Sequence, residues 1–431
     1  MNFEIIKTYI LTFLVLTSLL LTFALWNYQS NLEPLYGNSE FTNEVDLGGK
    51  EEMKRSIIQP NTIIFRNGGQ LYSFNSPLES KKFYQETQEW LLSDYQVNES
   101  EGRPSNDYQI EFVFPSKLPA EIIRNLFNIN EEDQLPNWSF QRMFIILNKE
   151  TSLLQLIFLS VDGEQEIKYN VNKSGAFTTL WSYFENVDEL REYIPLNNSN
   201  HPIYLPKDKV EIRTHSLAVK SIDETLLIDD LFTTPSLISP NFSGSYFTDG
   251  QRRLSLLQEG RTMEFINPIH STEGQKDVIE LLDLSMKNIN EHKGWTNEFH
   301  LVDINLYDEV IHYRMFHEGY PIFSSNDLTI IEQHWRNHDL HLYKRPLFSI
   351  SNLPGGKMVE LPAGTEIVNF LTNHENYQIS DIQDIQVGYK VTNFDDSSYS
   401  LSLEPAWYMN YNGYWSEIRI NELDDLIRGG S

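Results

Sequence analysis

The longest unbroken stretch of apolar positions stands at the start of the chain, between Lys7 and Glu33, where no charged residue occurs. Within it, Thr8–Trp26 is mostly apolar, and a helix over these residues would be about 28 Å long, close to the hydrocarbon thickness of a bilayer. The small-residue pattern of a signal-peptide cleavage site is missing from Ala24–Gln29. We therefore expect an uncleaved transmembrane helix that anchors the chain in a lipid bilayer.

The charges on either side of this segment predict its orientation. Lys7 and the amino terminus are positive, whereas Glu33, Glu40 and Glu44 follow the segment with no Lys or Arg before Lys50. Positive flanks stay in the cytoplasm. We expect a cytoplasmic N-terminus and an extracytoplasmic location for the bulk of the chain, bound to the cell membrane by a single pass.

Hydroxyl side chains follow one side of the predicted anchor. On a helical wheel Thr8, Thr12 and Thr22 share a narrow stripe, and Ser18 lies beside it. In lipid, such hydroxyls donate either to the i−4 carbonyl of their own helix or to a neighbouring helix. Both interpretations remain open, and the second makes these four residues a partner-binding stripe.

Beyond a polar linker, strand and helix patterns alternate in the first half of the chain. Asn67-Gly68-Gly69 separates two short apolar runs and predicts a hairpin turn. Ser76-Pro77 predicts the start of a helix whose apolar positions continue to Asp94. An antiparallel meander is expected at 140–147, 153–160 and 165–171, and a helix at 177–184.

The second half contains a weak internal repeat. A helix near 272–291 and a helix near 363–373 are each followed by strands that end in an aromatic, Gly-containing turn. Two related small domains explain this pattern, although a chance similarity of two helix–sheet units explains it as well.

These patterns together predict an α+β protein with a single N-terminal transmembrane helix and three extracytoplasmic α+β domains, the last two similar to each other. Their expected limits are 1–30 for the cytoplasmic stub and anchor, 31–56 for a linker, 57–200 for the first domain, 201–346 for the second and 347–431 for the third.

Composition narrows the possible functions. The 431 residues contain no cysteine, which excludes disulfides, thiol nucleophiles and Cys-ligated zinc. The formal net charge of −28 and the lack of any long Lys/Arg run argue against nucleic acid as a partner. A cysteine-free exported chain suits a Gram-positive bacterium.

A search for catalytic and cofactor motifs selects no residues. The chain has no phosphate-binding glycine loop, no H-E-x-x-H and no G-x-S-x-G. His334, His338 and His341 would share one face of a helix, but the local pattern predicts two strands joined by a turn, which separates the rings. We therefore expect no enzyme activity, no catalytic residues, no cofactor and no metal, with an anchored hydrolase as an unsupported alternative.

One aromatic cluster leaves a second function open. Trp407, Tyr408, Tyr411, Tyr414 and Trp415 crowd a predicted strand. Such residues pack one face on the core or, when exposed, bind glycans. A wall-associated ligand-binding module is therefore an alternative to a protein-binding role.

The chain resembles the YycH (WalH) family in length, layout and a series of short motifs. The order and spacing of these motifs carry the resemblance: Pro202–Pro206 with Val210-Glu211, Leu231-Phe232, Thr248–Leu254, Gly294–Thr296, Tyr313-Arg314, Gly319–Phe323, Arg345–Leu347 and Leu361-Pro362 with Gly364.

The resemblance implies a membrane-anchored, non-enzymatic regulator of the Wal (Yyc) two-component system of low-GC Gram-positive bacteria. Members act with a YycI-like protein on a membrane sensor histidine kinase (YycG/WalK) that controls cell-wall metabolism, and their transmembrane helices are expected to make the contact. A YycI-like paired regulator is the neighbouring alternative, but YycI is shorter and lacks the first domain.

Overall fold

The computed structural model describes residues 7, 11, 13–18, 45–196, 201–232, 239–240, 245–268, 277–374, 377–395 and 399–420. The chain divides into two compact units, Met1–Glu44 and Val45–Ser431. Within the described part of the first unit, residues 13–18 are helical, and no described helix is long and apolar enough to cross a bilayer. Most of the predicted anchor, including Thr8, Thr12 and Thr22, lies outside the described residues.

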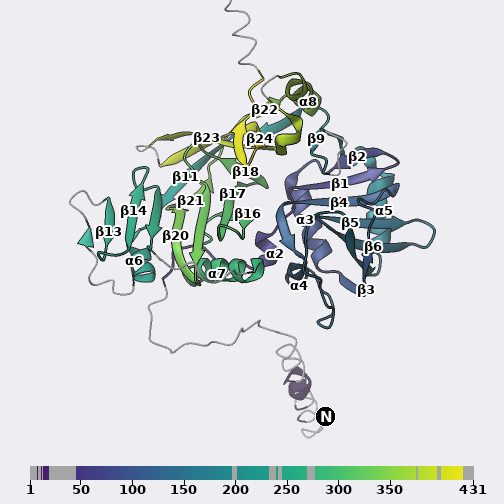
Figure 1. Cartoon of the computed structure of the whole chain (residues 1–431), viewed down its shortest axis with the longest axis horizontal. Helices are drawn as coiled ribbons and strands as arrows, with labels where there is room; N and C mark the ends of the chain where they lie inside the picture. The colour runs from purple at the N-terminus through teal and green to yellow at the C-terminus, as the bar shows by residue number, and fades with distance from the viewer. Residues whose placement is uncertain are drawn as a thin grey trace, which may run out of the picture. The chain divides into compact units, whose positions relative to one another are not determined.

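A nine-stranded antiparallel sheet forms the first part of the larger unit (Figure 1). Its spatial order is β3-β7-β6-β5-β4-β1-β2-β8-β9. The strands are β1 (Thr62–Asn67), β2 (Gln70–Ser73), β3 (Leu91–Glu99), β4 (Tyr108–Pro119), β5 (Ser139–Asn148), β6 (Leu153–Ser160), β7 (Gln165–Asn172), β8 (Arg191–Pro195) and β9 (Tyr204–Pro206).

Short-range signals place the first elements as predicted. Asn67 pairs with Gln70 across a turn in which Gly68 and Gly69 have φ of +57° and +97°, values that favour glycine. Helix α3 (Pro77–Gln88) starts with a capping box: the Ser76 hydroxyl accepts from the Leu78 amide at 3.3 Å, and the Glu79 carboxylate accepts from the Ser76 amide at 3.3 Å. The β5–β6–β7 meander is also confirmed.

Helix α3 and helix α5 (Ala176–Glu185) cover the same face of this sheet. The Phe65 ring of β1 lies 5.7 Å from the Phe83 ring of α3 and 5.8 Å from the Phe184 ring of α5. The Phe83 ring also stacks on Phe112 of β4. Burial of these aromatic side chains contributes to the hydrophobic stabilisation of the layer between the helices and the sheet.

The expected continuation of α3 to Asp94 is wrong. The helix ends at Gln88, and Leu91–Glu99 forms strand β3 on the edge of the sheet, paired with β7. Leu91 is exposed and Leu92 is buried, which is the alternation of a strand rather than a helix. A partner strand far away in the sequence, β7, decides this local conformation.

The remaining strands form a second, 14-stranded sheet and a two-stranded one. The strands are β10 (Val210–Arg213), β11 (His215–Ser221), β12 (Ser239–Pro240), β13 (Tyr246–Thr248), β14 (Arg253–Leu257), β15 (Thr262–Ile266), β16 (Glu298–Asn305), β17 (Val310–His317), β18 (Tyr320–Phe323), β19 (Ile330–Arg336), β20 (Asp339–Pro346), β21 (Phe348–Asn352), β22 (Met358–Leu361), β23 (Ile382–Asp395), β24 (Ser400–Tyr411) and β25 (Tyr414–Glu417).

Helices are short and few in the described part of the larger unit, so sheets dominate this α+β fold. Besides α3 and α5, they are α2 (Lys54–Ile57), α4 (Ile123–Leu126), α6 (Thr225–Leu231), α7 (Val278–Glu291) and α8 (Gly364–Asn373), with 3-10 turns at Ala120–Ile122, Val187–Glu189 and Ile379–Asp381. Helices α7 and α8 match the two helices predicted for the internal repeat.

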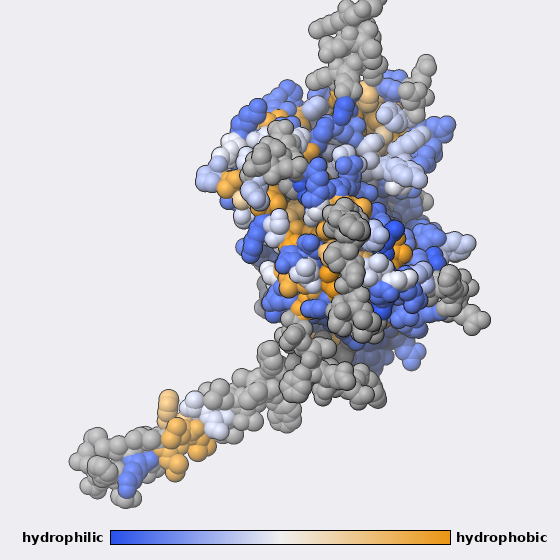
Figure 2. All heavy atoms as spheres, turned by 90° about the vertical axis from the view of Figure 1, so that its left-hand side faces the viewer, coloured by the Kyte–Doolittle hydropathy of each residue, from blue (hydrophilic) through white to orange (hydrophobic). Residues whose placement is uncertain are grey.

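The strand order crosses the predicted boundary at residue 346. Strand β11 lies between β24 and β21, and β10 pairs with β22. Strand β18 pairs in parallel with β23 and joins the two halves of the large sheet. Val45–Ser431 therefore behaves as one compact unit, and the division into three domains stays a prediction. On the face in Figure 2 hydrophilic side chains predominate, with hydrophobic ones gathered toward its middle.

Candidate functional site

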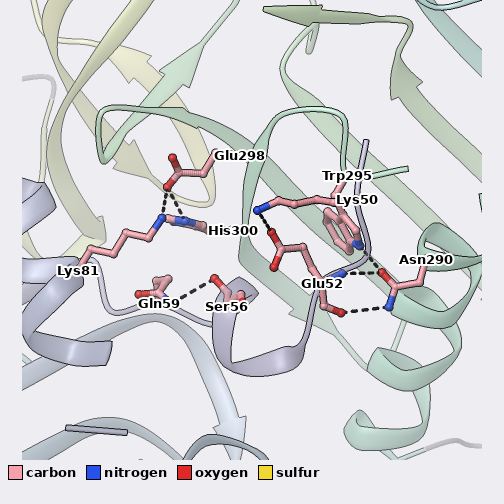
Figure 3. A network of polar contacts seen from close by, with 9 residues as sticks. All are labelled: Lys50, Glu52, Ser56, Gln59, Lys81, Asn290, Trp295, Glu298 and His300. Carbon is pink, nitrogen blue, oxygen red and sulfur yellow. Dashed lines mark hydrogen bonds and ion pairs between the residues drawn. The ribbon is translucent and has the colours of Figure 1, made fainter. Parts of the chain in front are cut away.

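Two distant segments of the larger unit meet along a contact that we call the seam, formed by residues 46–81 and residues 283–300 (Figure 3). Residues 45–56, which belong to the predicted linker, pack here against the end of α7: the Leu47 amide donates to the His292 carbonyl at 3.0 Å, and Lys50 forms a backbone bridge with Trp295. The seam therefore ties the start of the large unit to its second sheet.

Asn290 is the central polar residue of the seam. Its Oδ1 accepts from the Glu52 amide at 3.0 Å and from Trp295 Nε1 at 2.7 Å, and its Nδ2 donates to the Glu52 carbonyl at 3.0 Å. The Trp295 ring is buried and meets Tyr313 edge-on. These bonds satisfy buried polar atoms that would otherwise destabilise the contact.

A charged group lies at the other end of the seam. Lys81 of α3 donates to Glu298 Oε1 at 2.8 Å, and His300 Nε2 lies 3.0 Å from the same oxygen. Burial raises the pKa of Glu298, but the bonds and charges offered by His300 and Lys81 outweigh burial and lower it to about 2. Burial lowers the pKa of His300 more than Glu298 raises it. Lys81 is thus the main charged partner of Glu298 at neutral pH.

Chain segments approach very closely at two glycines, Gly49 within the seam and Gly319 in the β17–β18 turn, which contacts the seam residue Pro77. A Cβ atom at Gly49 would lie 2.5 Å from the Lys293 carbonyl oxygen, and one at Gly319 would lie 2.7 Å from Pro77 Cβ. Larger residues do not fit either position without moving the main chain. The two segments of the seam therefore fit each other in shape as well as in the pairing of their polar groups.

A cavity of about 680 Å³ lies between the first sheet and the strands of the second. Asp384, on its wall, accepts from Asn61 Nδ2 at 3.0 Å and from the Ile385 amide at 2.8 Å, and burial raises its pKa. The other wall carboxylate, Asp303, lies 3.4 Å from His312. Both carboxylates thus have hydrogen-bond or ion-pair partners within the fold.

Several motifs that carry the family resemblance hold the structure together. The buried Arg345 donates to the Gly294 carbonyl at 2.8 Å and to Thr296 Oγ1 at 3.2 Å. Arg142 donates to the Pro202 carbonyl at 3.0 Å and pairs with the buried Glu111. These motif residues position elements that lie far apart in the sequence.

The structure separates the three histidines considered as metal ligands. His334 on β19 lies 2.6 Å from Glu332, His338 in the following turn lies 2.8 Å from Glu280, and His341 Nδ1 on β20 contacts the Asn267 carbonyl at 2.7 Å. The strand–turn–strand interpretation is confirmed.

The aromatic cluster mainly packs inside. Trp407 is buried and donates to the Pro362 carbonyl at 3.0 Å, and the Tyr408 ring stacks on Phe323 with 3.8 Å between centroids. Tyr414 alone among the large aromatic residues of β24 and β25 is highly exposed in the described structure, at 80%. Core packing therefore accounts for most of the cluster.

Of the predicted partner-binding stripe, only Ser18 lies within the described residues, in the helical stretch, and Thr8, Thr12 and Thr22 do not. Sequence reasoning missed the seam and a cluster of His215, His317 and Glu318. Both join segments that are far apart in the chain, and no local periodicity signals such contacts.

Comparison with known proteins matches two family models to this chain, the YycH protein N-terminal domain over residues 4–189 and the YycH protein C-terminal domain over residues 200–425. The chain belongs to the YycH family. It is 23% identical over 440 residues, covering 96% of each chain, to a protein of Bacillus subtilis (strain 168) described as "Two-component system WalR/WalK regulatory protein YycH".

The fold agrees with that of a solved relative. The crystal structure of YycH from Bacillus subtilis matches with a TM-score of 0.72 and 19% identity, over 87% of this chain and 100% of that one. The family is one of two-component regulatory proteins and is not a family of enzymes.

Proposed function

We propose that this protein is a non-enzymatic regulator of a WalK-type sensor histidine kinase, and that it acts at the membrane together with a YycI-like partner to control cell-wall metabolism. The observation that carries the proposal is the match to both YycH domain models, which together extend from residue 4 to residue 425. The match includes the predicted transmembrane segment as well as the folded unit.

The anchor makes the first contact in this proposal. Thr8, Thr12, Ser18 and Thr22 bind transmembrane helices of the partners, with the N-terminus in the cytoplasm. Each interhelical hydrogen bond contributes about 0.6–2 kcal/mol. A coupling free energy of about 1–3 kcal/mol changes an equilibrium roughly 5–150-fold, which is enough to alter kinase output.

The folded unit acts as one body in this proposal. Because the seam joins residues 46–81 to residues 283–300, a partner bound to either sheet acts on the same compact unit. This connection supports a role in which binding outside the membrane is coupled to the anchor.

Co-purification from membranes tests the proposal. The full-length protein is compared with a version whose residues 1–30 are replaced by an unrelated transmembrane helix, and each eluate is probed for a WalK-type kinase and a YycI-like protein. Retention by the native protein alone supports recognition through the helix. Retention by both versions moves recognition to the folded unit and refutes the helix contact. If neither retains a kinase, the regulator proposal fails.

A further inference from the structure

Three potential metal ligands converge where β11 approaches the β17–β18 turn. His215 lies on β11, His317 ends β17, and Glu318 occupies the turn. One ligand atom from each residue can be chosen so that all three lie within 4.8 Å of one another. Among the described residues, this is the one such group of three or more His, Asp or Glu side chains.

The two imidazoles have unused nitrogen atoms. Nε2 of His215 and Nε2 of His317 are both buried and have no hydrogen-bond partner in the described structure. His215 is only 9% exposed, and its Nε2 lies 3.3 Å from the Glu318 carboxylate without a hydrogen bond. A buried ring nitrogen without a partner is costly, so a ligand that accepts both lone pairs offers a physical reason for this arrangement.

The two imidazoles pack against each other and share one aromatic neighbour. The two rings meet edge-on with centroids 4.7 Å apart, and Tyr389 packs against both. A neutral imidazole keeps the lone pair that a metal ion needs, and two cationic rings at this distance would repel each other.

We propose that His215, His317 and Glu318 bind one zinc-type divalent cation, through the two Nε2 atoms and the carboxylate. Two imidazoles and a carboxylate form a donor set typical of zinc, with a fourth position for water. Zinc ligands about 2.0–2.1 Å from the ion lie roughly 3.4 Å apart. The His215–Glu318 separation of 3.3 Å already fits this value, whereas atoms separated by up to 4.8 Å must move closer together on binding. Glu318 is 44% exposed and can make that adjustment.

An ion bound at this site would connect two elements that are far apart in the chain. It joins β11 to the β17–β18 turn, and the next residue of that turn, Gly319, lies directly against Pro77 at the start of α3. An ion here fixes the turn that carries part of the contact between the two sheets.

The alternative is a cation-free pair between a protonated His215 and Glu318. That pair needs no second imidazole and leaves His317 Nε2 without a partner. The two assignments differ in one measurable respect, because only the metal site requires His317.

Cobalt(II) binding to the purified full-length protein in detergent tests the proposal. We expect one cobalt per chain, with visible absorption bands of a four-coordinate ion, and displacement of cobalt by zinc. H215Q and H317Q should abolish these bands, and E318Q should weaken binding at least tenfold. The matched control is H338Q, which removes a histidine that also contacts a glutamate, Glu280.

Folding of each variant is checked without metal by its thermal unfolding midpoint. Zinc should raise this midpoint for the native protein and for H338Q but not for H317Q. If loss of a buried histidine prevents folding, E318Q still tests the proposal, because the Glu318 side chain is exposed and its replacement should leave the fold intact. Absence of stoichiometric cobalt binding, or equal binding by the native protein and by folded H317Q or E318Q, overturns the proposal.

Discussion

The Asn290 side chain pairs with the Glu52 main chain in both directions, accepting from the amide and donating to the carbonyl, each at 3.0 Å. The two residues are 238 positions apart. One amide side chain thus fills both backbone hydrogen bonds that a neighbouring strand would have made, and it fixes the start of the large unit to the end of α7.

Replacement of Asn290 by Ala should lower the free energy of unfolding by about 1–3 kcal/mol, because the Glu52 amide and carbonyl and Trp295 Nε1 all lose their partner. Urea denaturation followed by tryptophan fluorescence measures the change. Asn373, in the last turn of α8, donates to the Asn369 carbonyl of its own helix at 2.9 Å and provides a matched control. Asn373→Ala should change stability by less than about 0.5 kcal/mol, and equal losses in the two variants would contradict the role assigned to Asn290.

The lowered pKa of Glu298 leads us to expect that the protein loses stability in acid. Its pKa in the folded protein is about 2, below the usual value, so its ionised form stabilises the fold above the unfolded-state pKa. This contribution should be present at neutral pH and fall as the pH drops from about 5 toward 2. Urea denaturation of native protein and Glu298→Gln should therefore give curves that differ at neutral pH and converge in acid.

The control for this experiment is Glu360→Gln, which breaks an exposed pair with Lys209. Exposed pairs contribute about 0–1 kcal/mol, so this variant should stay close to the native protein throughout. A Glu298→Gln variant that tracks the native protein at every pH would show that the Lys81 contact contributes no stability.

Gly49 and Gly48 are neighbours that should respond very differently to alanine. At Gly49 the new Cβ would lie 2.5 Å from one carbonyl oxygen and 2.6 Å from another, and main-chain atoms cannot rotate away. Gly48 has open space around it, and its φ of +80° is the only penalty, about 1 kcal/mol. Thermal unfolding should show a clearly larger loss for Gly49→Ala. Equal losses would mean that residues 45–50 detach from Trp295 at little cost.

The predicted stripe of the anchor can be tested against the opposite side of the same helix. Replacing Thr8, Thr12, Ser18 and Thr22 together by Leu should uncouple kinase regulation, measured as autophosphorylation in reconstituted membranes, without changing the unfolding of the large unit. Thr17 donates to the Phe13 carbonyl of its own helix at 2.6 Å, so Thr17→Leu should leave regulation unchanged. Unaltered kinase output in the fourfold variant would remove the helix contact from the proposal.

The sequence was sufficient to predict those elements whose conformation depends on residues next to one another in the chain. The Gly68-Gly69 turn and the Ser76 cap depend on a few adjacent residues, and both are confirmed. The end of α3 was placed wrongly because the pairing of Leu91–Glu99 with β7 overrides an apolar spacing that also fits a helix.

The seam and the histidine cluster could not be predicted from the sequence because the residues that form them are far apart in the chain. His215 is about a hundred positions from His317, and Glu52 is 238 from Asn290, so their neighbours in the sequence carry no sign of the contact. The family motifs were visible as a series, but their role in joining elements, as in Arg345 with Gly294, needed the fold. The anchor remains a prediction.

The position of β11 between β21 and β24 also affects the order in which the molecule can form. A growing chain completes β11 at Ser221, but its neighbour β24 begins only at Ser400. Until then β11 has unpaired backbone groups and the risk of pairing with another chain. The second sheet can be completed only after synthesis has passed β24, so a ribosome stalled shortly before Ser400 should hold a chain whose first sheet is folded and whose second is still incomplete.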